Sequence, residues 1–128
     1  MIILLDTSSS LCKLTIIDDD KCYSEEWRAD KGLAKGLLSY LAKIIEQHSM
    51  TWSDIAAIGV FKGPGSFTGL RIGLTVMNTI ADSLAIPIVG GRGEKWQDIV
   101  LAKLHAGQNE KIVLPFYGSD ANITTSLK

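Results

Sequence analysis

The sequence lacks an excess of charge of either sign. Its 128 residues include 13 lysines and arginines and 14 aspartates and glutamates, which gives a formal net charge of -1. Domains that bind nucleic acid through a basic face carry a clear positive excess, so this balance argues against such a face, although a local patch is compatible with it. The 46% of hydrophobic residues and 21% of charged residues are typical of a folded globular domain.

Long hydrophobic runs are also missing. No apolar run approaches the roughly 18 residues that a membrane span needs. The apolar start at residues 2–5 is short and lacks the basic segment that opens a signal peptide. We therefore expect a cytoplasmic protein without membrane contact, in which Cys12 and Cys22 are reduced thiols.

Metal ligands and paired catalytic groups are scarce. The two cysteines and the two histidines, His48 and His105, match no zinc-binding spacing. Asp6 is the best single carboxylate, and we interpret it as a turn-capping residue at the end of the first strand. The sequence thus predicts no catalytic residue, no metal and no cofactor.

Hydrophobic periodicity predicts three strands followed by alternating helices and strands. The predicted strands are 2–5, 11–17, 21–28, 55–61 and 86–89, and the predicted helices are 31–47, 67–84 and 94–104. The acidic run 18–20 is expected to form a solvated hairpin tip, and residues 51–54, Thr-Trp-Ser-Asp, a capping box. This order predicts an α/β fold whose mixed five-stranded sheet has an antiparallel start and flanking helices.

A glycine-rich loop lies between the fourth predicted strand and the second predicted helix. Its glycines at 63, 65 and 69 favour a tight turn, and Ser66 or Thr68 can cap the helix. Free N–H groups at such a helix start can attract an anion. However, the glycine spacing fits neither the phosphate-binding loop nor the dinucleotide fingerprint. A turn without ligand is the main interpretation, and a small nucleotide-binding or phosphotransfer protein is the alternative.

The second predicted helix lacks the charged outer face of a surface helix, since no charged residue occurs from 72 to 81. Glycines lie four residues apart in both of the first two helices, at 32 and 36 and at 69 and 73, which allows close approach of another helix. Packing of each helix on its own sheet is the alternative. The residues predicted to contact a partner are Gly32, Gly36, Tyr40, Gly69, Arg71, Ile72, Gly73, Val76, Met77 and Ile80.

Residues 63–73, Gly-Pro-Gly-Ser-Phe-Thr-Gly-Leu-Arg-Ile-Gly, resemble the signature of the TsaB (YeaZ) family. The opening residues 3–8, Ile-Leu-Leu-Asp-Thr-Ser, are similar to the family's first strand, and the resemblance covers about residues 1–90. It implies an actin-like (ASKHA), ribonuclease-H-like fold. The loop part of the signature consists of Gly63, Pro64, Gly65, Ser66, Phe67 and Thr68.

The resemblance also implies a function. TsaB proteins are non-catalytic partners of TsaD, which transfers threonylcarbamoyl to adenosine 37 of tRNA, and the ATPase TsaE joins the complex. The family contacts TsaD largely through its first two helices, which correspond here to 31–47 and 67–84. The resemblance also allows a homodimer through a similar surface. It implies that the chain contacts tRNA only as part of the complex. A homodimer with a different client is a further alternative.

The chain departs from the family pattern in length. Typical members are nearly twice as long and carry a second domain of similar fold. We expect a single ribonuclease-H-like domain over residues 1–110, a short C-terminal tail over 111–128, and no second domain. Residues 114–117, Leu-Pro-Phe-Tyr, resemble the final tail of longer members.

Overall fold

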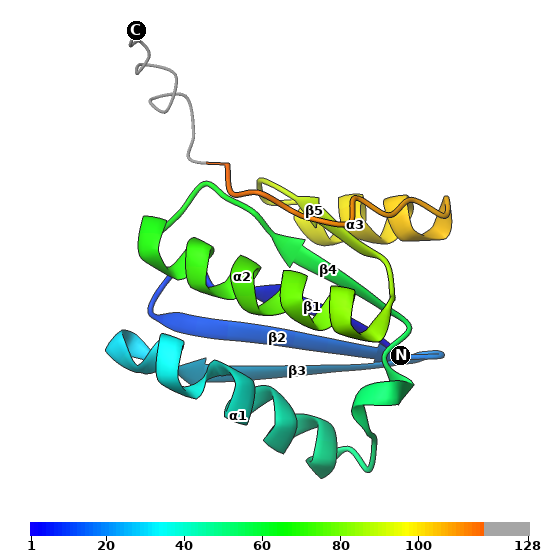
Figure 1. Cartoon of the computed structure of the whole chain (residues 1–128), viewed down its shortest axis with the longest axis horizontal. Coiled ribbons are helices and arrows are strands. Elements are labelled where there is room, and N and C mark those ends of the chain that lie inside the picture. Colours follow the sequence, from blue (N-terminus) through cyan, green and yellow to red (C-terminus); the bar gives the residue numbers. More distant parts are fainter. Residues whose placement is uncertain (117–128) are drawn as a thin grey trace, which may run out of the picture.

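The computed structural model describes residues 1–116, which form a five-stranded sheet with helices on both faces (Figure 1). Two short 3-10 helices, Asp30–Gly32 and Trp52–Asp54, precede α1 and β4. The strands are β1 (Ile2–Asp6), β2 (Leu11–Asp18), β3 (Lys21–Arg28), β4 (Ala57–Phe61) and β5 (Ile88–Gly91). The helices are α1 (Leu33–Gln47), α2 (Phe67–Leu84) and α3 (Trp96–His105).

Every predicted strand and helix is present, with boundaries that differ by at most two residues. The bounds of β3 and α2 agree with the prediction. β4, β5, α1 and α3 each begin two residues later than predicted, and β5 also ends two residues later, so that it runs from Ile88 rather than from residue 86. Pro87 has no N–H to donate to a neighbouring strand, although its carbonyl oxygen accepts a hydrogen bond of 3.0 Å from the Ile58 N–H.

The strand order in the sheet is β3-β2-β1-β4-β5. The pairs β1–β2 and β2–β3 are antiparallel, whereas β1–β4 and β4–β5 are parallel. Parallel neighbours require a crossover, and α1 and α2 lie on the two crossovers that lead into β4 and β5. The predicted mixed sheet with an antiparallel start is therefore confirmed.

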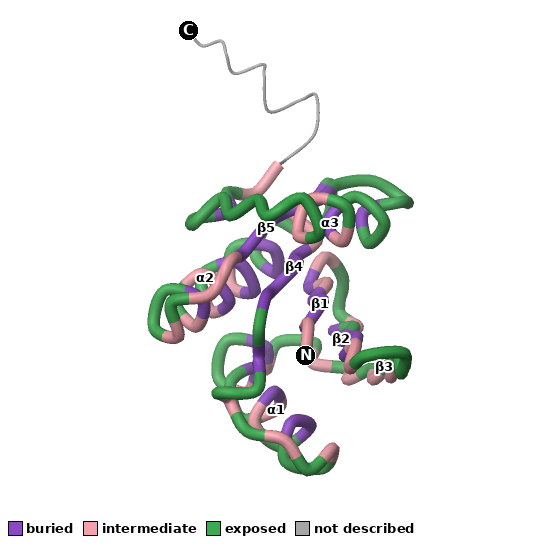
Figure 2. Tube along the Cα trace, turned by 90° about the vertical axis from the view of Figure 1, so that its right-hand side faces the viewer, coloured by how far each residue is buried: buried purple, intermediate pink, exposed green. Residues whose placement is uncertain are grey.

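The two faces of the sheet are covered unequally. Helices α1 and α2 pack on one face, where their buried residues, purple in Figure 2, meet Leu14, Ile16 and other inward side chains of the strands. On the other face, α3 packs through Trp96 and Val100 on Leu4 and Val89. The alternation of Leu14 and Ile16 on one face of β2 agrees with the period of two expected from the sequence.

Two local predictions are confirmed. In the acidic run, Asp19 and Asp20 form the exposed turn between β2 and β3, and Asp18 is the last residue of β2. Thr51 and Asp54 form a capping box, in which the Thr51 N–H donates to the Asp54 carboxylate at 2.8 Å. His48 is the C-cap residue that directly follows α1, and its Nε2 lies 3.2 Å from the Glu25 carboxylate.

The predicted boundary at residue 110 falls inside a segment, residues 109–116, that is bonded to β5 and α2. The division into a domain and a tail stays a prediction. Most of the predicted tail, residues 117–128 with Tyr117, lies outside the described residues. Among the helices of residues 1–116, none is long and apolar enough to cross a membrane.

Candidate functional site

The glycine-rich loop is a tight turn, and three N–H groups at the junction of the loop and α2 donate hydrogen bonds within the domain. Ser66 caps α2, since its Oγ accepts a hydrogen bond of 3.3 Å from the Gly69 N–H. The Ser66 N–H donates to the Ser8 carbonyl at 2.8 Å, and the Leu70 N–H donates to the Ser66 carbonyl at 2.9 Å. Of the two predicted caps, the structure selects Ser66. These donors are occupied, which favours a turn without ligand.

The loop glycines allow close backbone packing. Gly63 has a φ of 129°, a conformation that residues with a side chain rarely adopt, and a Cβ there would overlap the Phe116 carbonyl oxygen. A Cβ at Gly65 would overlap Ser8. Pro64 and Thr68 are exposed beside them. The loop therefore joins the end of β4 to the turn after β1 and to the segment that follows α3.

The expectation that Gly69 and Gly73 open a helix face to a partner needs correction. A Cβ at Gly69 would overlap the Thr7 carbonyl oxygen, and one at Gly73 would overlap the Thr7 side chain. Both glycines are buried, as is Met77, whose exposed fraction is 1%. Packing of α2 on its own sheet, the alternative interpretation, explains these three positions.

Gly36 and Tyr40 also face the domain rather than its outside. A Cβ at Gly36 would lie 2.8 Å from the Trp27 ring, and Tyr40 stacks on the same ring with centroids 4.9 Å apart. Burial, together with nearby Cys12 and the β3 glutamates, raises the pKa of Tyr40 to about 12. These two residues fix α1 on β3. Gly32 differs from both, because a Cβ there would meet nothing within 4 Å.

Arg71, Ile72, Val76 and Ile80 of α2 line a groove between α1 and α2. The two helices lie side by side on the same face of the sheet (Figure 1). Two adjoining hollows, of about 530 Å³ and 410 Å³, make up this helix groove and share Thr75 and Val76. The groove is lined by Ala34, Leu38, Trp52, Thr68, Arg71, Ile72, Thr75, Val76, Thr79, Ile80, Ser83 and Leu84. Arg71 is the one charged residue among them, so the groove is apolar with a basic end.

The prediction missed Leu38, a prominent apolar residue of the groove. Its exposed fraction is 54%. The buried stripe of α1 includes Leu37 and Leu41, and Leu38 lies off that stripe on the outer side. A large apolar residue outside the buried stripe of an amphipathic helix is the signal that could have identified it. Arg71, at the other end of the groove, lies over the exposed Phe67 ring at 5.6 Å from the centroid.

Asp6 and Cys12 are titratable side chains on the neighbouring strands β1 and β2. The Asp6 carboxylate accepts a hydrogen bond of 2.8 Å from the Ser8 N–H, which confirms Asp6 as a turn-capping residue. Burial, with a contribution from Asp6, raises the pKa of the Cys12 thiol to about 12. Within residues 1–116, no three side chains of His, Cys, Asp or Glu gather as metal ligands.

Comparison with known proteins identifies relatives of this fold. A family model described as "TsaD: tRNA N6-adenosine threonylcarbamoyltransferase" matches residues 28–90, which contain α1, β4 and α2. A protein of Buchnera aphidicola subsp. Schizaphis graminum named "tRNA threonylcarbamoyladenosine biosynthesis protein TsaB" is 30% identical over 70% of this chain and 43% of its own length. The protein of the same name from Bacillus subtilis is 33% identical over 68% of this chain and 38% of its own length.

A solved structure, "YeaZ from Pseudomonas aeruginosa", superimposes with a TM-score of 0.67 and 26% identity. The match covers 71% of this chain and 43% of that one. The chain thus spans less than half the length of the relatives it matches. The likeness confirms the expected actin-like, ribonuclease-H-like fold class.

Proposed function

Because the chain belongs to the TsaB (YeaZ) family, we propose that it is a non-catalytic subunit in the biosynthesis of threonylcarbamoyladenosine in tRNA, and that it binds TsaD through the helix groove. The observation that carries the proposal is the groove itself. Its centre is lined by apolar and hydroxyl side chains, on a chain whose positive and negative charges nearly balance. Apolar surface of this kind favours a protein partner over solvent.

The match of residues 28–90 to a TsaD family model supports TsaD as the partner. These residues contain α1 and α2, so a TsaD subunit is expected to present two related helices. Two related subunits can pair about an approximate two-fold axis through equivalent surfaces, as identical subunits do. In such a pair the helix groove of this chain receives the corresponding helices of TsaD.

The side chains of the groove suit an interface of this type. Leu38 supplies an exposed apolar side chain, and full burial of a leucine contributes roughly 1.5–3 kcal/mol. Ile72, Val76 and Ile80 are half-buried and follow one another along α2. Arg71 lies at the end of the groove, where a rim contact with a carboxylate sets orientation more than affinity.

The role we propose is structural support of the TsaD active site. TsaE joins as a further subunit, and tRNA contacts the assembly rather than this chain alone. A homodimer through the same groove is the competing assembly, since a second copy offers the same apolar helices. A nucleotide-binding role is less supported, because Ser66, Gly69 and Leu70 already donate their N–H groups within the domain.

Light scattering after size-exclusion chromatography tests this proposal on the chain mixed with TsaD of the same organism. We expect a mixed complex, and Leu38→Glu should weaken it at least about tenfold by placing a charge in the interface. Ile99→Glu is the matched control, because Ile99 is an exposed isoleucine of α3, on the other face of the sheet. If Leu38→Glu leaves the complex intact, binding of TsaD through the helix groove is refuted. A stable homodimer that does not bind TsaD would favour the alternative of a different partner protein.

A further inference from the structure

The two edge strands of the sheet are protected in different ways. β3 carries its own charges, since Lys21, Glu25, Glu26 and Arg28 all lie within it. β5, the opposite edge, reads Ile-Val-Gly-Gly and carries none. An uncharged edge strand presents free backbone groups to any other strand, so a stable protein covers it or pairs it.

The outer edge of β5 is covered by groups that follow it in the sequence. The Ile88 N–H donates to Asn109 Oδ1 at 3.1 Å, and the Gly90 N–H donates to Glu110 Oε1 at 2.9 Å. The Ile88 carbonyl accepts from the Glu110 N–H at 2.9 Å, and the Gly90 carbonyl accepts from Lys103 Nζ at 2.7 Å. Three of these four bonds come from side chains, which take the place of a neighbouring strand.

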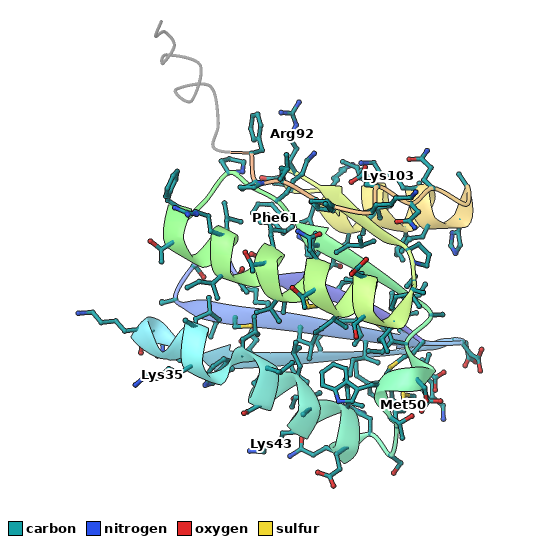
Figure 3. All side chains as sticks on the ribbon, viewed as in Figure 1. Lys35, Lys43, Met50, Phe61, Arg92 and Lys103 are labelled. Atoms are coloured by element: carbon teal, nitrogen blue, oxygen red, sulfur yellow. The ribbon has the colours of Figure 1, made fainter. Side chains whose placement is uncertain are left out.

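The same segment continues across the sheet edge to α2 and the glycine-rich loop. Asn78 of α2 bonds both backbone groups of Val113, at 2.9 Å and 3.0 Å, and the Val113 side chain is buried. The Phe116 N–H donates to the Lys62 carbonyl at 2.6 Å, and Arg92 lies 4.1 Å over the Phe116 ring. Figure 1 draws the segment in orange beside β5, and Figure 3 shows Lys103 and Arg92 along it.

We propose that residues 109–116 form a strap that closes the β5 edge against strand pairing, and that release of the strap lets this edge pair with β5 of a second copy of the chain. The strap offers β5 only one backbone hydrogen bond, from the Glu110 N–H. A true strand would replace the side-chain bonds to Ile88 and Gly90 with backbone bonds.

A second copy is the occupant that the edge fits. The outward N–H and C=O groups of Ile88 and Gly90 form the pattern of a short antiparallel ladder, which two copies can share about a two-fold axis. Pairing between two β5 strands brings no like charges together, because β5 has no charged residue. The β3 edge is less suited, since its own charges oppose pairing.

The test removes the side-chain bonds in the full chain with the double variant Asn109→Ala, Glu110→Ala. Gln108→Ala, Lys111→Ala is the matched control, because these flanking residues are exposed and the bond of Lys111 is made by its backbone. Both doubles carry Leu38→Glu, which blocks association through the helix groove and separates this test from that of the proposed function. The measurements are amide exchange at Ile88 and Gly90 and the molar mass in solution.

In the strap variant we expect exchange at the two amides to be at least about tenfold faster at low concentration, where the chain is a single copy, because pairing of two copies bonds the same amides again. We also expect the molar mass to rise twofold with concentration, while the control stays at the mass of one chain. Unchanged exchange overturns the proposal, as does faster exchange with an unchanged mass. If the double variant does not fold, Lys103→Met, which removes the bond to the Gly90 carbonyl, is judged by the same two criteria.

Discussion

The hydroxyl of Thr7 donates a buried hydrogen bond of 2.8 Å to the carbonyl oxygen of Gly69, across 62 positions of the sequence. Thr7 directly follows β1, and Gly69 lies in the first turn of α2. The bond brings the helix so close to the strand that neither Gly69 nor Gly73 has space for a side chain. Two of the glycines in the family signature therefore serve the packing of β1 on α2.

Replacement of Gly73 tests this packing. Alanine usually stabilises a helix interior relative to glycine, but Gly73→Ala should lower the free energy of unfolding by about 1–3 kcal/mol because the new methyl group collides with Thr7. Urea unfolding measures the change. Gly32→Ala is the control and should have little effect, since the space beside Gly32 is open. Equal effects of the two variants would contradict the packing assigned to Gly73.

The two cysteines should differ in reactivity. Cys12 is buried, and burial together with Asp6 raises its pKa to about 12, whereas Cys22 is exposed. Only the thiolate reacts with a disulfide reagent. At mildly alkaline pH the folded chain should therefore react quickly at one thiol, and Cys22→Ser should abolish that fast phase. Two equally fast thiols in the folded chain would show that Cys12 is accessible.

Tyr40 offers a test on α1. Its hydroxyl is buried and has no hydrogen-bond partner among the described residues, while its ring stacks on Trp27. Tyr40→Phe keeps the stacking and removes an unsatisfied polar atom, so the free energy of unfolding should be unchanged or higher. Tyr40→Ala, which loses the stacking, should be clearly less stable. A large loss of stability in the phenylalanine variant would reveal a bond to the hydroxyl.

The lowered pKa of Glu110 predicts that the stability of the fold depends on pH. Burial acts to raise its pKa, but hydrogen bonds from Lys103 and the Gly90 N–H outweigh burial and hold the pKa below its ordinary value. A carboxyl whose pKa is lower in the folded state stabilises the fold above its unfolded-state pKa of about 4.3. That contribution disappears as the pH falls through the lower, folded-state value.

The measurement compares the unfolding of the parent chain and of Glu110→Gln across acidic to neutral pH. The difference in the free energy of unfolding between the two proteins should be largest near neutral pH and should decrease as the pH becomes acidic. Glu94→Gln, at an exposed glutamate, is the control. A difference that grows with acidity would mean that Glu110 is not stabilised as a carboxylate.

Local signals predicted the elements of the fold well. The capping serine at residue 66 and the proline at residue 87 bracket α2, and its bounds agree with the prediction. These signals do not determine the role of the helix glycines. Glycines four residues apart indicate that another element packs close to the helix, but they do not say whether it belongs to a partner or to the same domain. The deciding neighbour of Gly69 and Gly73 is Thr7, which is distant in the sequence.

The surface was predicted less completely. The lack of charge on α2 predicts Ile72, Val76 and Ile80, whereas glycine spacing gives no indication of Leu38, an exposed leucine of α1. The side chains of Asn109 and Glu110 gave no signal at all. They act by bonding the backbone of β5, about 20 positions earlier, and such bonds leave no periodic pattern.

The proposed function requires that α1 and α2 together form the surface that binds TsaD. Amide hydrogen exchange of the chain, measured alone and with TsaD of the same organism in excess, tests it most directly. We expect slower exchange on binding along the outer sides of α1 and α2, centred on Leu38 and Val76, with exchange in α3 and β3 unchanged. Slower exchange confined to α3 or to β3, or no change anywhere, would contradict it.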